Sequence, residues 1–125
     1  MTTSGIPPDE AGFFTGHPEA WKIYLAVRSM VQSVGPSLVR VSTSQVAFRR
    51  RRGFAYVWMP GRWLRHPASE VVLSVALGRP DPSPRFKQVA HPAKGVWIHH
   101  LEVRHVAALD DEVERWIREA YETAR

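Results

Sequence analysis

Apolar residues recur at helical spacing in two stretches, one near each end of the chain. The first stretch begins near Pro18, and its apolar positions are Ala20, Ile23, Tyr24, Val27, Met30, Val31 and Val34. This spacing predicts an amphipathic helix, which Gly35 and Pro36 are expected to end as a left-handed cap followed by a breaker. In the second stretch, the apolar positions are Leu109, Val113, Trp116, Ile117, Ala120 and Tyr121, and Asp110 stands where this stripe begins. We therefore expect a second helix with Asp110 as its N-cap.

Between the two predicted helices, short apolar runs are typical of β-strands. The predicted strands cover residues 38–42, 45–49, 54–59, 71–77 and 97–104. In the third run, Phe54, Tyr56 and Trp58 are expected to share one face of the sheet. Gly53 is expected to supply a positive φ in the hairpin before this run. Residues 60–69 and the Pro-rich residues 78–95 are predicted to be loops.

The order of these elements predicts an α+β fold. Short connections between the first strands favour antiparallel pairing. Two amphipathic helices can bury their stripes most simply on one face of a sheet, which gives a two-layer sandwich. We expect an antiparallel sheet of about five strands, with an N-terminal and a C-terminal helix packed on one face. Residues 1–16 lack periodicity and are expected to be a disordered arm, and residues 17–125 a single domain.

Composition narrows the class of protein. The chain has no cysteine, so disulfides and thiolate metal sites are excluded, and a cytoplasmic setting is expected. The N-terminus lacks the basic and apolar segments of a secretory signal. No apolar run approaches the roughly 20 residues that a membrane helix needs, so no membrane association is expected.

Charge is distributed unevenly along the chain. Residues 20–69 contain no Asp or Glu and carry nine of the Lys and Arg residues. The densest part of this basic stretch comprises Arg49, Arg50, Arg51, Arg52, Arg62 and Arg65. Arginine forks bind phosphate oxygens, and Trp63 is placed to stack on a base. The cluster predicts a nucleic-acid or other polyanion partner, and the alternative is a solvated hairpin tip that discourages edge aggregation.

Residues 52–59 resemble the RNA-binding strand of RNA recognition motifs at every position except the last aromatic one, where Met59 stands. That fold requires crossover helices that this chain does not offer. Gly35 and Pro36 interrupt the first place for such a helix, and a proline-bounded loop occupies the second. We therefore reject that family and expect the aromatic strand, or its opposite face, to pack under the helices.

Catalytic and metal-binding patterns are weak. Of the histidines, His100 and Glu102 are expected to share one strand face, with His99 on the other. Two neighbouring ligands do not make a transition-metal site, so a metal-assisted enzyme using His99, His100 and Glu102 is a distant third hypothesis. The chain has no GxSxG sequence and no Gly-rich phosphate loop. No catalytic residue, metal or cofactor is predicted.

Several core and turn positions resemble the domain of unknown function 5655 over nearly the whole chain after residue 16. They are the helix end at Gly35, the pattern at residues 46–48, the Phe54-Ala55 pair and the last helix from Trp116 to Tyr121. Thr43 stands where the family often has a lysine. In longer proteins a similar domain follows a nuclease-like domain, so the resemblance implies a nucleic-acid setting by analogy.

Two functions are therefore open for a small, non-catalytic binding module. The first is nucleic-acid binding through the basic hairpin. The second is binding of a protein or a small ligand through the outer sheet face and the Pro-rich loop at residues 78–95. In the second function, Trp63, Phe86 and Trp97 would be the aromatic anchors.

Overall fold

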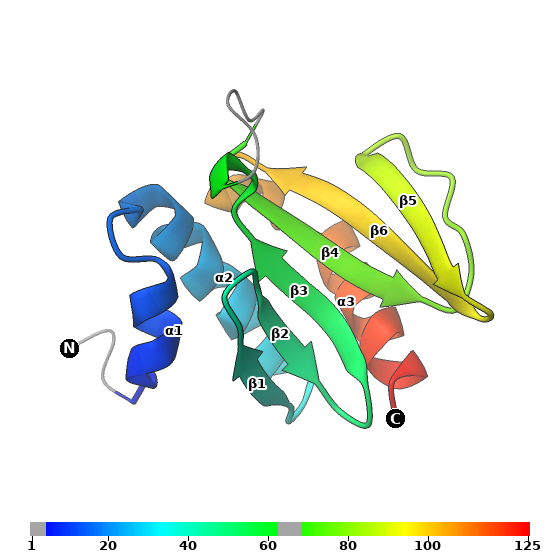
Figure 1. The fold of residues 1–125 in the computed structure, drawn as a ribbon. Helices are drawn as coiled ribbons and strands as arrows, with labels where there is room; N and C mark the ends of the chain where they lie inside the picture. Colours follow the sequence, from blue (N-terminus) through cyan, green and yellow to red (C-terminus); the bar gives the residue numbers. More distant parts are fainter. Residues whose placement is uncertain (1–4, 63–68) are drawn as a thin grey trace.

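Two helices cover one face of an antiparallel sheet in the computed structural model (Figure 1), which describes residues 5–62 and 69–125. Within these residues the sheet has six strands in the order β1-β2-β3-β4-β6-β5. The strands are β1 (Leu38–Val41), β2 (Val46–Arg49), β3 (Gly53–Trp58), β4 (Val71–Leu77), β5 (Phe86–Ala93) and β6 (Val96–Val103). The helices are α1 (Pro8–Phe13), α2 (Pro18–Val34) and α3 (Asp111–Thr123), with short 3₁₀ turns η1 (Pro60–Arg62) and η2 (Val106–Ala108).

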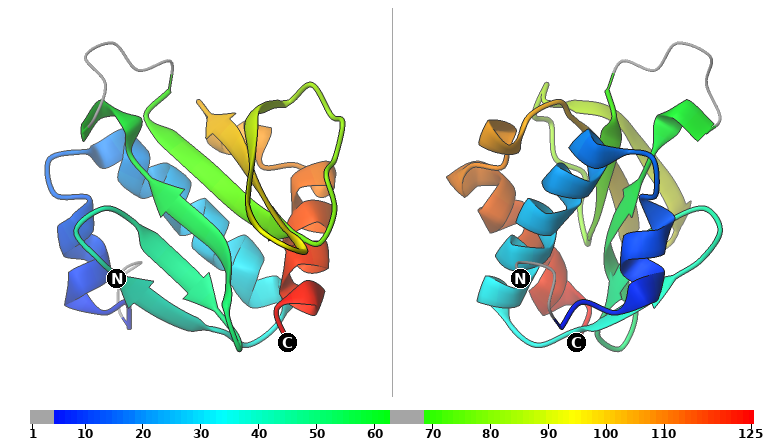
Figure 2. Two further views of the ribbon diagram at one scale, coloured as in Figure 1. Left: turned by 45° about the vertical axis from the view of Figure 1, so that its right-hand side comes forward. Right: turned by 90° about the vertical axis from the view of Figure 1, so that its left-hand side faces the viewer.

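The core lies between the sheet and the apolar stripes of α2 and α3 (Figure 2). The buried stripes are Ala20, Ile23, Tyr24, Val27 and Val31 on α2, and Val113, Trp116, Ile117, Ala120 and Tyr121 on α3. Alternate residues of the strands, such as Phe48, Val57 and Leu73, face these helices. The predicted two-layer α+β sandwich, with both helices on one face, is confirmed. Asp110 also caps α3 as predicted, because its side chain accepts a hydrogen bond from the Val113 N–H at 3.1 Å.

The sheet gains its sixth strand from the segment that we expected to be an irregular loop. Residues 86–93 form β5, which pairs antiparallel with β6 at the edge of the sheet. Pro92 fits there because an edge strand has one side on which no ladder hydrogen bond is required. Gly95, with φ of 76°, makes the tight turn between β5 and β6. Periodicity alone missed this strand because an exposed, proline-containing edge strand has no apolar alternation.

The prediction of a disordered arm over residues 1–16 is wrong for residues 8–13, which form α1. Pro8 occupies a first-turn position that suits proline. Phe13 and Phe14 are buried, and the ring of Phe14 stacks on that of Tyr24 at 4.7 Å between centroids. A six-residue helix is too short to show periodicity in the sequence, and packing against α2 is what stabilises it.

Two glycines have a different role from the predicted one. Gly35 has φ of 164°, which is extended backbone, and Gly53 does not have a positive φ. A Cβ atom on Gly35 would lie 2.6 Å from Cζ of Tyr121, and one on Gly53 would lie 2.8 Å from Cζ of Tyr56. At both positions glycine lets an aromatic ring lie against the backbone, which a side chain would displace, and neither glycine makes a left-handed turn.

The Pro-rich connection before β5 is fastened to α3 by polar contacts. Arg79 forms a two-point ion pair with Glu119, with both N–O distances 2.8 Å. Arg85 contacts the carboxylates of Asp110 and Glu112. The N–H of Val113 and then Arg85 lower the pKa of Asp110, which keeps the cap charged. The described part of this connection is thus bound to the helix layer.

Candidate ligand-binding site on the outer sheet face

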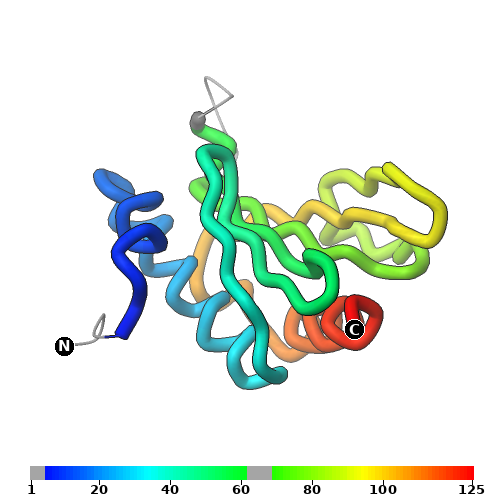
Figure 3. The backbone as a smooth tube through the Cα atoms, turned by 60° about the horizontal axis from the view of Figure 1, so that its bottom comes forward, coloured from blue at the N-terminus to red at the C-terminus, as the bar shows by residue number. Residues whose placement is uncertain are grey.

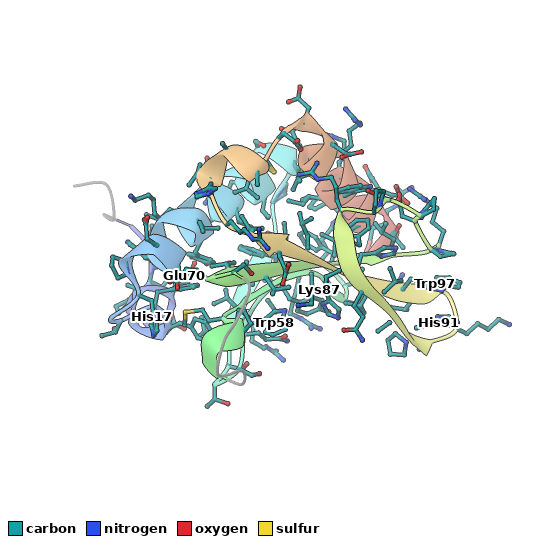
Figure 4. All side chains as sticks on the ribbon, turned by 90° about the horizontal axis from the view of Figure 1, so that it is seen from above. His17, Trp58, Glu70, Lys87, His91 and Trp97 are labelled. Carbon is teal, nitrogen blue, oxygen red and sulfur yellow. The ribbon has the colours of Figure 1, made fainter. Side chains whose placement is uncertain are left out.

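The sheet face opposite α2 and α3 carries aromatic and polar side chains. Strand alternation places Tyr56 and Trp58 of β3, Ser74 of β4, and Ile98 and His100 of β6 on this outer face. The register aligns Tyr56 with Ser74 and Ser74 with His100, so these residues form a row across three strands. Figure 4 shows Trp58 on the side of the sheet away from α2 and α3. We call these five residues the floor of the outer-face trough.

Three adjoining hollows form the trough. The main hollow has a volume of about 460 Å³ and is lined by the floor residues together with Ser44 and Gln45 of the β1–β2 turn. A second hollow of about 160 Å³ shares Trp58 and His100 with it and reaches Lys87, Gln88 and Glu102. A third, of about 260 Å³, shares Tyr56 and Ile98 and reaches the β2–β3 and β5–β6 hairpins. The main volume is in the range of roughly 300–1,000 Å³ that small-molecule sites occupy.

A hydrogen-bonded chain crosses the floor of the trough. The indole N–H of Trp58 donates to Oγ of Ser74 at 2.9 Å, and this oxygen lies 2.6 Å from Nδ1 of His100. The rings of Trp58 and His100 also meet edge to face, with centroids 5.9 Å apart. These contacts fix the orientation of all three side chains before any ligand binds.

The hydrogen bonds from Trp58 through Ser74 also determine which ring nitrogen of His100 carries the proton. An indole N–H can only donate, so Ser74 accepts from Trp58, and its own hydroxyl proton is available to Nδ1 of His100. Burial, and then the neighbouring His99, lower the pKa of His100, which favours the neutral ring. Nδ1 is then the acceptor and Nε2 carries the proton. Because His100 lines both the main and the second hollow, this N–H is a donor available to a ligand.

Ser74 and His100 are a hydroxyl–imidazole pair, but their setting is unsuited to nucleophilic attack. Ser74 is only 2% exposed and lies in the middle of β4. Strand pairing on both sides of β4 occupies the nearby backbone N–H groups that an oxyanion would need. The observed role of the pair is to hold the Trp58 and His100 rings in place on the sheet face.

Part of the basic hairpin, residues 50–52, contacts the C-terminal end of α3. A guanidinium N–H of Arg50 donates to the carbonyl oxygen of Tyr121 at 3.0 Å, and the group lies 3.9 Å from the centre of the Tyr121 ring. Arg52 donates to the carbonyl of Thr123 at 3.1 Å, and the backbone N–H of Arg51 to that of Ala124 at 3.1 Å. The hairpin thus caps the C-terminal end of α3 (Figure 3), where free carbonyls and the helix dipole favour cations.

The remaining residues of the predicted basic site do not all meet. Arg49 and Arg52 line the third hollow together. Arg51 is exposed, and neither it nor Arg49 forms a side-chain hydrogen bond or ion pair with any residue in ranges 5–62 and 69–125. Trp63 and Arg65 fall outside the described residues, as does the side chain of Arg62.

Some predicted aromatic positions also change. Phe54 was expected to share a face with Tyr56 and Trp58, but it is fully buried and meets Tyr121 edge to face at 5.4 Å. A register shift after Phe48 turns the start of β3, which explains the difference. Phe86, a proposed exposed anchor, is 8% exposed because it packs between His99 and Trp116. Trp97 is half-buried and stacks on His91 with 4.1 Å between centroids.

The described residues do not provide the ligand geometry that the third hypothesis, a metal site, requires. His99 and His100 lie on opposite faces of β6, as predicted, and His99 is fully buried. Glu102 pairs with Lys87 at 2.9 Å. No group of three or more potential ligand residues within the described ranges is arranged to hold a metal ion.

Sequence reasoning overlooked two floor residues, Ser74 and Ile98. Ser74 interrupts the otherwise apolar residues 71–77, and this single polar position was a usable signal for an outward-facing contact. Ile98 gave no such signal, because an apolar residue in a strand is usually assigned to the core.

Fold and trough together define a two-layer α+β domain with a candidate ligand-binding face. The model of the family described as Domain of unknown function (DUF5655) matches residues 10–124, so the chain belongs to this family, and the resemblance noted from the sequence is confirmed. No curated protein and no solved structure matches the chain. In the part of the chain that the structure describes, no helix is both long enough and apolar enough to cross a membrane.

Proposed function

We propose that this protein is a binding module that holds a small ligand in the outer-face trough. The observation that carries the proposal is the hydrogen-bonded series of Trp58, Ser74 and His100 beneath an open hollow of about 460 Å³. The half-buried rings of Tyr56 and Trp58 offer apolar contact to a planar group. His100 offers a directed N–H donor from its neutral ring. The expected setting remains the cytoplasm.

The proposal predicts binding of N-phenyl-1-naphthylamine, an uncharged aromatic probe whose fluorescence rises in apolar sites. We expect saturable binding to the wild-type protein and at least a tenfold loss of affinity in Ile98→Glu, because the carboxylate would stand in the trough floor and resist desolvation. A fluorescence titration measures both affinities.

Val89→Glu is the matched control, since Val89 is 39% exposed on the edge strand β5 and lines none of the three hollows. We expect it to bind the probe as the wild type does. Equal loss in the two variants, or no saturable binding at all, would contradict the proposal.

A second candidate function is nucleic-acid binding through the basic hairpin. The observation in its favour is that Arg49 and Arg51 have no side-chain partner among the described residues, and that Arg49 borders the trough. Stacking of bases over Tyr56 and Trp58 would extend such a site across the sheet face. The two functions differ in the number of phosphates contacted, so salt dependence separates them.

A fluorescein-labelled single-stranded oligodeoxythymidine tests the second function by anisotropy. If Arg49, Arg51 and Arg52 each contact one phosphate, a fourfold rise in salt should lower the affinity roughly tenfold or more. Arg51→Gln should weaken the binding and flatten the salt dependence. Absence of binding at low salt would remove this candidate and leave the small-ligand proposal intact.

A further inference from the structure

We propose that the ligand of the trough is a planar organic anion whose charged group lies between Arg49 and Arg52. This inference rests on the proposed small-ligand function and specifies the ligand class. The charged group would occupy the third hollow, and the planar part would extend over Tyr56 and Ile98 toward His100. Carboxylate, sulfonate and phosphate groups share the chemistry required.

The third hollow continues directly from the main one. Tyr56 and Ile98 line both of them, so one ligand can span the boundary. At its far end the third hollow reaches Gly95, where the absence of a side chain lets a ligand approach the backbone of the β5–β6 hairpin. Its volume of about 260 Å³ accommodates a small charged group with part of a ring.

Arg49 has a guanidinium group with no protein partner in the described ranges. Strand alternation directs it to the outer face, where it is half-buried at the rim of the third hollow. A partly desolvated cation interacts more strongly with an incoming anion than a fully solvated one. Arginine also presents two parallel N–H groups that match a carboxylate or a phosphate.

Arg52 is held in place for the same task. Its guanidinium donates one hydrogen bond to the carbonyl oxygen of Thr123, at the C-terminal end of α3. A guanidinium has five N–H donors, so the others remain available. The bond to α3 restricts the side chain and lowers the entropy lost on binding an anion. The partial negative charge of the helix end reduces the attraction of Arg52 for an anion somewhat.

Charge along the trough is polarised. Neither the main nor the third hollow is lined by Asp or Glu among the described residues. The one carboxylate that lines the second hollow, at the other end, is Glu102, and it is paired with Lys87. An anion would therefore orient with its charged group toward Arg49 and Arg52 and its neutral part toward Trp58 and His100.

Two related fluorescent probes test the inference. 8-Anilinonaphthalene-1-sulfonate carries a sulfonate on the same ring system as the uncharged N-phenyl-1-naphthylamine. We expect Arg49→Gln to lower the affinity for the sulfonate probe about tenfold, as loss of a charged hydrogen bond does, and to leave the uncharged probe unaffected. Arg52→Gln should act in the same direction. Circular dichroism of each variant confirms that the fold is retained.

Arg51→Gln is the matched control, because it removes the same charge from an exposed residue that lines none of the hollows. It should leave the affinity for both probes within about twofold of the wild type. Equal loss of sulfonate binding in Arg49→Gln and Arg51→Gln would show only general attraction to a basic protein, and it would overturn the inference.

The outcomes separate this inference from the proposed function. If the uncharged probe binds and Arg49→Gln leaves both affinities unchanged, the anion site is wrong and the trough remains a binding site. If neither probe binds at the trough, the proposed function itself fails. Phenyl phosphate and benzoate at millimolar concentration should displace the sulfonate probe, and the stronger competitor identifies the preferred charged group. Failure of both to displace it would also overturn the inference.

Discussion

Glu10→Ala is expected to lower the free energy of unfolding by about 3 kcal/mol, because it breaks a buried ion pair by removing one partner. Glu10 is 1% exposed. Its carboxylate accepts hydrogen bonds from the Tyr24 hydroxyl and from Nε of Arg28, the latter at 2.8 Å. Burial, and then the hydrogen bond to Glu10, raise the pKa of Tyr24, so this hydroxyl remains a donor. Urea denaturation followed by circular dichroism measures the loss.

The loss arises because the buried hydroxyl of Tyr24 and the partly buried guanidinium of Arg28 are left without their acceptor. The Arg28 side chain is only 16% exposed, so water cannot fully replace the carboxylate. Glu19→Ala is the matched control. The ion pair of Glu19 with Lys22 at 3.1 Å joins side chains that are 63% and 69% exposed, so its loss should change stability by less than about 0.5 kcal/mol.

The comparison also tests whether α1 belongs to the cooperative fold. Glu10 lies on α1, and both of its partners lie on α2. If α1 detached from α2 before the rest of the protein unfolded, Glu10→Ala would lower the free energy of unfolding by no more than the free energy with which α1 packs on the fold. A change in Glu10→Ala as small as that in Glu19→Ala would show that α1 is not part of the cooperative unit, contrary to the structure.

His99→Ala should lower the free energy of unfolding by a similar amount, about 3 kcal/mol. The ring is fully buried, with Phe86 4.7 Å away between centroids. Its Nε2 accepts a hydrogen bond from the backbone N–H of Asp81 at 2.9 Å, and Nδ1 lies 3.1 Å from the carbonyl oxygen of Trp97. Alanine would leave a cavity and would remove the partner of each backbone group.

The same substitution should loosen the connection before β5, because Asp81 is bound through His99 to β6 and through its carboxylate to Nε1 of Trp116 at 3.2 Å. The rate of backbone amide hydrogen exchange at residues 81–86 should therefore be higher in His99→Ala than in the wild type. His105→Ala is the control, since His105 is exposed and its side chain caps nothing. An equal stability for the two variants would contradict the structural role of His99.

The parts of the fold that could be predicted are the elements whose apolar residues all face one buried layer. The stripe from Ala20 to Val31, and the alternate residues of β4 from Val71 to Leu77, each face a single apolar layer, so periodicity identified them. The elements α1 and β5 depend on tertiary contacts instead. The first is fixed by the buried carboxylate of Glu10, and the second by pairing with β6. Neither contact leaves a periodic signal in the sequence.

The candidate site shows the same division. The sequence indicated that the outer sheet face could bind a ligand and that arginines are concentrated near residue 50. It could not show that Arg50 reaches Tyr121, because 71 residues separate them along the chain. Nor could alternation place Phe54 correctly, since the register shift after Phe48 interrupts the two-residue period.

Tyr56 and Gly53 determine how open the trough is. The phenol ring of Tyr56 lies back against Gly53, on the hairpin from which it comes, and this seat exists only because position 53 has no side chain. From this seat the ring lines both the main and the third hollow. A side chain at position 53 would push this ring from its seat, and it would thereby change the shape of both hollows.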